Sequence, residues 1–142
     1  MDYQTAIRGA FFDIARVCDS ADVIAQQARY LEDGLLFIHD GKILAQMAWQ
    51  EGEQYLDPYK GYTDLRGKLL LPGFVDTHVH YPQTEIIGAF GEQLLEWLTT
   101  YTFPVESQFA DEAYAKEIAA FFINQLVSHG TTTALVFCTL HP

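Results

Sequence analysis

The sequence predicts an α/β chain, in which a strand-rich N-terminal part precedes a strand–loop–helix–strand unit. An Asp-Gly pair between two apolar runs indicates a β-hairpin early in the chain. Near the end, apolar residues at helical spacing separate two short apolar runs, which indicates a parallel βαβ unit. Repeated eight times, such units close a (β/α)8 barrel. The sequence therefore favours the N-terminal part of such a barrel, behind a small β-rich region.

The first part of the chain is expected to be mostly strands. Residues 6–14 are apolar and aromatic, and residues 35–39 and 42–46 flank the Asp-Gly turn. Residues 22–30 allow a helical turn or two. Residues 51–63 are polar and contain glycine and proline, which predicts an irregular connection.

The second part begins with a short strand at residues 69–71, which Pro72 and Gly73 interrupt because proline cannot donate to a ladder. Residues 74–80 form the next strand, and residues 92–101 form a short helix within a long connection.

A better helix is predicted over residues 112–128, with Asp111 as N-cap and Gly130 past its C-terminal end. Its apolar stripe consists of Ala115, Ile118, Ala119, Phe122 and Leu126. The following strand, residues 132–137, is almost continuously apolar, which predicts burial on both faces in a parallel sheet.

The strand at residues 74–80 carries the strongest chemical signal. Alternation places Asp76, His78 and His80 on one face, so two imidazoles face the same way. Neutral imidazole is a good zinc ligand, and this pattern favours a zinc site. The alternative is two rim histidines satisfied by neighbouring hydrogen bonds. Asp76 either orients His78 or caps a buried polar layer.

Two histidines do not complete a catalytic zinc site, which usually has three protein ligands and a water. Of the other histidines, His39 and His129 are expected in ordinary surface positions, and His141 either approaches the site or is an ordinary loop residue. The missing ligands are therefore expected beyond Pro142. No catalytic acid or base is assignable here, although Glu85, Glu92 and Glu96 lie in the long connection.

Composition limits the partners of the chain. A formal charge of −11 argues against nucleic acid or an anionic membrane as partner, because both would repel it. Neither a signal peptide nor an apolar run of membrane-spanning length is visible. Cys18 and Cys138 imply no disulfide framework. These features predict a cytoplasmic protein.

Residues 71–80, Leu-Pro-Gly-Phe-Val-Asp-Thr-His-Val-His, resemble the first-strand motif of the amidohydrolase superfamily. Residues 81–83, 94–98, 101–106 and 130–134 are more selective, and with that motif they resemble the guanine deaminase family. The resemblance extends over the whole chain. It implies a metallo-dependent hydrolase barrel: residues 1–70 would form a small β-rich, sandwich-like domain, and residues 71–142 would begin the (β/α)8 barrel.

The resemblance also implies a function. In that family zinc supports the hydrolytic deamination of guanine to xanthine and ammonia, a step of purine catabolism. His78 and His80 match the first two zinc ligands. Gln83 matches the glutamine that contacts the purine, and His80, Tyr81 and Pro82 would line the pocket beside it. Trp97 is either a further wall of the pocket or part of the core.

Two alternatives stay open at this point. The parent enzyme could act on another cyclic amidine or amide. The 142-residue chain could also be a non-catalytic fragment, because two of about eight barrel strands leave sheet edges that pair with other copies. The sequence therefore predicts an inactive chain that self-associates, as a homodimer or otherwise.

Overall fold

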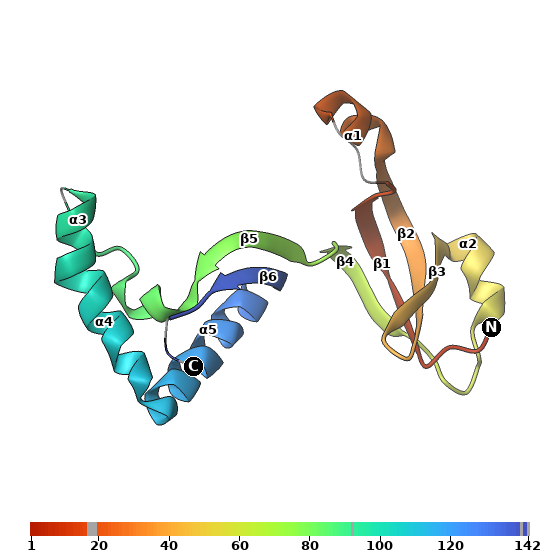
Figure 1. The fold of residues 1–142 in the computed structure, drawn as a ribbon. Helices are drawn as coiled ribbons and strands as arrows, with labels where there is room; N and C mark the ends of the chain where they lie inside the picture. The colour runs from red at the N-terminus through yellow and green to blue at the C-terminus, as the bar shows by residue number, and fades with distance from the viewer. Residues whose placement is uncertain (17–19, 92, 140, 142) are drawn as a thin grey trace. The chain divides into compact units, whose positions relative to one another are not determined.

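A computed structural model describes residues 1–16, 20–91, 93–139 and 141 (Figure 1). Contacts divide the chain into two compact units, Met1–Pro72 and Gly73–Pro142, and each unit has its own sheet. Two residues that the sequence interpretation used, Cys18 and Glu92, lie outside the described residues.

The first unit is built on one four-stranded sheet with the order β3-β2-β1-β4. Its strands are β1 (Thr5–Ile14), β2 (Ala28–His39), β3 (Lys42–Ala48) and β4 (Thr63–Leu70). Strand β1 runs antiparallel to β2 and parallel to β4. The helical segments of this unit are α1 (Ala21–Gln27), α2 (Trp49–Gly52) and the short 3-10 helix η1 (Glu53–Tyr55).

The predicted hairpin between β2 and β3 is confirmed. Asp40 and Gly41 have φ values of 47° and 70°, the positive values that a two-residue type I′ turn requires at both central positions. The Gln4 side chain donates to the Asp40 carboxylate at 2.8 Å and accepts from the Asp40 backbone N–H. The turn is therefore fixed by both local conformation and a contact from the start of β1.

Two elements of the first unit differ from the sequence prediction. Strand β2 begins at Ala28, well before the apolar run, because Arg29 pairs across the ladder with Asp13 at 2.6 Å. The stretch expected to be irregular begins with α2 and η1. Gly52, at the end of α2, packs so closely on Leu35 that an added Cβ would lie 2.9 Å from its Cδ1.

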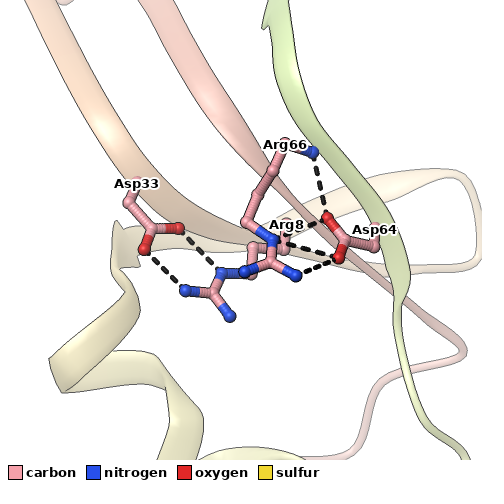
Figure 2. A network of polar contacts seen from close by, with 4 residues as sticks. All are labelled: Arg8, Asp33, Asp64 and Arg66. Carbon is pink, nitrogen blue, oxygen red and sulfur yellow. Dashed lines mark hydrogen bonds and ion pairs between the residues drawn. The ribbon is translucent and has the colours of Figure 1, made fainter.

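The core of the first unit lies on one side of its sheet. Tyr3, Ala6, Leu35 and Phe37 form it, and the Tyr3 and Phe37 rings meet edge to face at 5.1 Å. Figure 2 shows a charged network on strands β1, β2 and β4. In it Arg8 donates twice to Asp33, at 2.8 and 2.7 Å, and Arg66 binds Asp64.

The second unit contains one βαβ unit, as predicted, because β5 (Phe74–His80) and β6 (Thr131–Phe137) pair in parallel. The connection between them is helical. It comprises η2 (Tyr81–Ile86), α3 (Leu94–Trp97), the π-helical turn η3 (Leu98–Thr102), α4 (Phe103–Ser107), η4 (Gln108–Ala110) and α5 (Glu112–Ser128).

The short helix predicted over residues 92–101 continues further than expected, through η3 and α4. At the junction the Phe103 N–H donates to the Leu98 carbonyl, five residues earlier, which is the bond of a π turn. Pro104 follows directly. Because proline has no N–H and its ring clashes with the carbonyl four residues before it, a regular α-helix is disfavoured at this point.

Helix α5 agrees with its prediction. The Asp111 carboxylate accepts from the Ala113 N–H at 2.8 Å, and Gly130 follows the helix with φ of 86°. The predicted stripe faces inward, and Ile118 and Phe122 are its most buried members. One face of α5 therefore supplies the core of this unit.

The prediction that β6 is buried on both faces is wrong for this chain. Leu135 is 62% exposed, and on the neighbouring strand Phe74 and Val75 are 59% and 65% exposed. The reason is that the sheet in the described part of this unit has two strands. No helix among the described residues is long and apolar enough to cross a membrane.

Candidate functional site

His78 and His80 lie at the C-terminal end of β5, and their Nε2 atoms are 3.1 Å apart. Two nitrogens at about 2.0–2.1 Å from one tetrahedral zinc would be separated by about 3.3–3.4 Å. The observed separation is close to that value. The same separation is that of a hydrogen bond between the two imidazoles, and it also lets both nitrogens approach one metal ion.

The backbone around this pair departs from a regular ladder. The pairing of β5 with β6 shifts between Asp76 and Val79, and the Asp76 Oδ1 atom accepts from the His78 N–H at 3.0 Å. The Asp76 carboxylate thus holds the backbone of His78 rather than its ring. Sequence alternation correctly places Asp76 beside His78 but does not reveal this local contact.

Phe137, at the end of β6, packs against both imidazoles. Its ring centroid is 4.6 Å from that of His78 and 4.8 Å from that of His80, and it stacks on His80 at 14°. In the strand register Phe137 is the partner of His80. Sequence analysis missed this contact, although the parallel pairing of the two predicted strands is the signal that finds it.

The described residues bring no third metal-binding side chain to the pair, since no group of three or more His, Cys, Asp or Glu is found among them. His39 lies in the first unit beside Asp40, and His129 closes α5 with its Nδ1 atom 2.8 Å from the Gln125 carbonyl. His141 lines a different cavity, with Tyr81 and Cys138.

A cavity of about 380 Å³ adjoins the histidine pair. Its lining includes His78, His80, Gln83, Thr84 and Trp97. This polar lining, together with apolar residues of η2 and the loop after it, suits a small, partly polar ligand.

Gln83 lies on η2 and lines this cavity, and its amide is held by a residue of α4. Its Nε2 atom donates to the Oε1 atom of Glu106 on α4, at 3.1 Å, and both side chains are half-buried. Glu106 did not emerge as a site residue from the sequence. It lies 23 residues further along the chain, so only the packing of α4 on η2 brings the two together.

Tyr81 and Pro82 occupy different surroundings from Gln83. Pro82 is fully buried. The Tyr81 ring meets Phe109 edge to face at 5.1 Å and lies 6.0 Å from the ring of Phe122. Burial raises the pKa of the Tyr81 hydroxyl. Neither residue lines the histidine cavity, and both anchor η2 on which Gln83 stands.

Trp97 combines the two roles that the sequence left open. It lines the cavity, and its Nε1 atom donates to the Ala89 carbonyl at 3.1 Å. Gly91 approaches so closely that an added Cβ would lie 2.6 Å from the Trp97 Cβ. The indole is therefore a fixed wall rather than a mobile one.

Helix α5 is also tied to η2 by a polar contact. The Tyr114 hydroxyl donates to the Glu85 carboxylate. Burial, and then this carboxylate, raise the pKa of Tyr114 to about 12. The neutral hydroxyl is thus the form that the fold stabilises, and it holds η2 in place.

Comparison with known proteins identifies relatives of this chain. The model of the amidohydrolase family matches residues 69–142. The guanine deaminase of Escherichia coli (strain K12) is 53% identical over 137 residues, which cover 96% of this chain and 31% of the relative. The chain thus spans about a third of the length of this relative. The resemblance to guanine deaminases inferred from the sequence is confirmed.

Solved structures agree with these matches. The E. coli guanine deaminase superposes with a TM-score of 0.94 at 52% identity, covering 98% of this chain and 32% of that chain. A guanine deaminase from C. acetobutylicum, solved with bound guanine in the active site, has a TM-score of 0.71 at 28% identity over 96% of this chain and 30% of its own.

A more distant structure supports the fold alone. An adenosine deaminase from Xanthomonas campestris, solved with bound zinc, has a TM-score of 0.67 at 19% identity over 95% of this chain and 29% of its own. The predicted fold class, the N-terminal part of an amidohydrolase barrel, is therefore confirmed.

Proposed function

The chain belongs to the amidohydrolase family, and on that basis we propose that it is part of a zinc-dependent guanine deaminase. The reaction is the hydrolytic conversion of guanine to xanthine and ammonia, a step of purine catabolism. One observation carries the proposal: two convergent imidazole nitrogens, 3.1 Å apart, share a cavity with the half-buried amide of Gln83.

His78 and His80 would hold the zinc ion, together with ligands outside this chain. When bound, zinc supplies a water activated for attack at neutral pH. Asp76 fixes the His78 backbone and Phe137 fixes the plane of the His80 ring. These two contacts limit the movement of the pair, which favours metal binding by reducing the ordering that it requires.

Gln83 would bind the purine. An amide carries an acceptor and two donors, so it reads the polar edge of a ring with alternating N–H and lone-pair groups. Trp97 forms an apolar wall of the same cavity, against which a planar ring can pack. The bound guanine of the C. acetobutylicum relative supports guanine as the substrate class.

The domain roles follow from the same proposal. Residues 1–70 would belong to a small β-rich domain, and residues 71–142 would open the barrel with its first strands. The exposed apolar side chains of β5 and β6 would be covered in the whole protein, and in residues 1–142 alone they would promote self-association, as a homodimer or a larger species. The protein would act in the cytoplasm.

The test is turnover by the full-length protein that carries this sequence. Purified with zinc, it should convert guanine to xanthine faster than it deaminates other cyclic amidines, and a chelator should remove the activity. Dominant turnover of a different cyclic amidine or amide would replace guanine as the substrate. Turnover that survives complete removal of the metal would contradict the zinc assignment.

The metal ligands are tested by a pair of histidine variants. His78→Ala should lower activity and zinc affinity by more than about 100-fold, because it removes a direct ligand and not merely a group that supports one. His129→Ala, at the exposed end of α5, is the matched control and should keep both.

Residues 1–142 alone should bind zinc weakly and deaminate nothing, since the described residues gather no third ligand around His78 and His80. Measurable guanine turnover by that chain would contradict this expectation.

A further inference from the structure

We infer that Glu106 fixes the orientation of the Gln83 amide and thereby selects which hydrogen-bonding edge of a ring the cavity accepts, an inference that rests on the proposed deaminase function. Glu106 would act as a positioning residue. It accepts a hydrogen bond from Gln83, which lines the cavity together with His78 and His80, and it is not itself one of the lining residues.

The chemistry of the pair gives the direction of the amide. The oxygen and nitrogen of a glutamine amide are similar in size, so an unrestrained amide can turn over by 180° at little steric cost. An ionised carboxylate only accepts hydrogen bonds. At the 3.1 Å contact, therefore, the Gln83 NH₂ group must face Glu106, because the reversed amide would place two acceptor oxygens together.

The position of Glu106 depends on the helix that carries it. The π turn η3 immediately precedes α4 and adds one residue to a helical turn. One extra residue rotates everything that follows by about 100° around the helix axis. Helix α4 packs on η2, and with this rotation position 106 faces Gln83. The π turn η3 thus helps to place the carboxylate that orients the amide.

A fixed amide has a consequence for the ligand. One N–H of Gln83 is used by Glu106, which leaves Oε1 as an acceptor and the second N–H as a donor. Their order is set by the carboxylate. The cavity should accept a ring edge with an N–H opposite Oε1 and a lone pair opposite Nε2, and it should reject an edge with the reverse order.

The experiment compares Glu106→Gln with wild type in the full-length protein. A glutamine at 106 both donates and accepts, so it keeps the shape of the site but lets the Gln83 amide turn over. We expect KM for guanine to rise about tenfold and kcat to change by less than about threefold, as for loss of one hydrogen bond to a charged group used in binding. Glu96→Gln, at an exposed site on α3, is the matched control and should match wild type.

Discrimination between ring edges gives a second readout that a merely structural role would not move. Inhibition constants are measured for guanine analogues in which one ring N–H is methylated or one ring nitrogen is replaced by C–H. Among the analogues of each kind, wild type should bind one much more weakly than the others. Glu106→Gln should reduce this difference in inhibition constant about tenfold. Glu106→Asp keeps an acceptor-only carboxylate and should retain more discrimination than Glu106→Gln.

The outcomes separate the inference from the function on which it rests. Guanine turnover with the same KM and the same discrimination in Glu106→Gln would overturn the inference alone. A large fall in kcat with no change in KM in Glu106→Gln would also overturn it. Weaker discrimination in Glu106→Asp than in Glu106→Gln would do the same. Absence of guanine turnover in the wild-type protein would overturn the proposed function and the inference together.

Discussion

The two units bury their apolar side chains in different ways. In Met1–Pro72, Leu35 and Phe37 are fully buried by neighbours from the same sheet and from α2. In Gly73–Pro142, the helical connection packs on itself around Phe109 and Phe122, while the strands leave Phe74, Val75 and Leu135 more than half exposed. Leucines on strands of the two sheets, Leu35 and Leu135, thus reach opposite degrees of burial.

The difference shows where each unit obtains its stability. The first unit closes its core with residues from its own strands and short helices. The second unit closes only the helical side and positions the site residues at the edge of an uncovered sheet. Side-chain contacts between elements also differ: arginine–aspartate pairs join β1 to β2 in the first unit, whereas the uncharged Gln83 and Tyr114 donate to carboxylates in the second.

The largest test of this contrast replaces one leucine in each sheet. In the 142-residue chain, Leu35→Ala should lower the free energy of unfolding by about 3 kcal/mol, because it leaves a cavity in a closed core. Leu135→Ala should cost less than about 1 kcal/mol, because its side chain is already largely in water. Urea unfolding measures both.

Equal costs for the two leucine variants would contradict the contrast. A larger cost for Leu135→Ala in the full-length protein than in residues 1–142 would sharpen it, because that increase would measure how far the rest of the protein covers the sheet.

The second test measures the stability of the first unit at acid pH. Bonds to Arg8, Arg29 and Arg66 lower the pKa of Asp33, Asp13 and Asp64, the last to about 2. A carboxyl whose pKa is lower in the folded state stabilises the fold above its unfolded pKa, about 4, and this is lost as pH falls through the folded value. The first unit should therefore lose stability between about pH 4 and pH 2.

Thermal unfolding at a series of pH values measures this acid limb, the fall of stability between about pH 4 and pH 2. Asp64→Asn should make the fall shallower. An acid limb of unchanged steepness in Asp64→Asn would contradict the assignment to this carboxylate.

The third test measures stability at alkaline pH and concerns the Tyr114 hydroxyl of the second unit. The pKa of Tyr114 is raised to about 12 in the folded state, from about 10 in the unfolded chain. Its contribution is complete below pH 10 and is lost as pH rises toward 12. Tyr114→Phe should flatten the stability profile over this interval, as read by thermal unfolding, whereas Tyr59→Phe, a nearly fully exposed control, should leave the profile unchanged.

The smallest expected effect compares two helix caps. Asp111→Ala should cost about 1 kcal/mol, since Asp111 caps α5 at 2.8 Å and that helix carries the core of the second unit. Ser20→Ala should cost less than about 0.5 kcal/mol, because its bond to Val23 is 3.4 Å long and α1 has no buried residue. Urea unfolding ranks the two, and the reverse order would contradict the difference in packing.

Local chemistry made part of this structure predictable. The hairpin at Asp40 and Gly41, the cap at Asp111 and the strand with His78 and His80 each depend on residues a few positions apart. For the same reason the sequence could place both imidazoles on one face. The start of β2 at Ala28 could not be predicted, because it depends on a partner strand.

Distant contacts explain what the sequence did not reveal about the site. Glu106 reaches Gln83 only after a π turn whose hydrogen bond shifts by one residue, and periodicity at 3.6 residues does not anticipate such a shift. Phe137 is an ordinary apolar strand residue in the sequence, and only the parallel register makes it a neighbour of His80. The exposure of Leu135 follows from the number of strands in the sheet, which no local pattern encodes.

The break in pairing between Asp76 and Val79 gives the backbones of the two histidines different supports. The backbone of His80 is paired with β6 in the strand register, and Phe137 of β6 contacts both imidazole rings. His78 is held by a side chain of its own strand. The distance between the two Nε2 atoms therefore depends on the position of β6 against β5. A metal bound between them would be sensitive to that position.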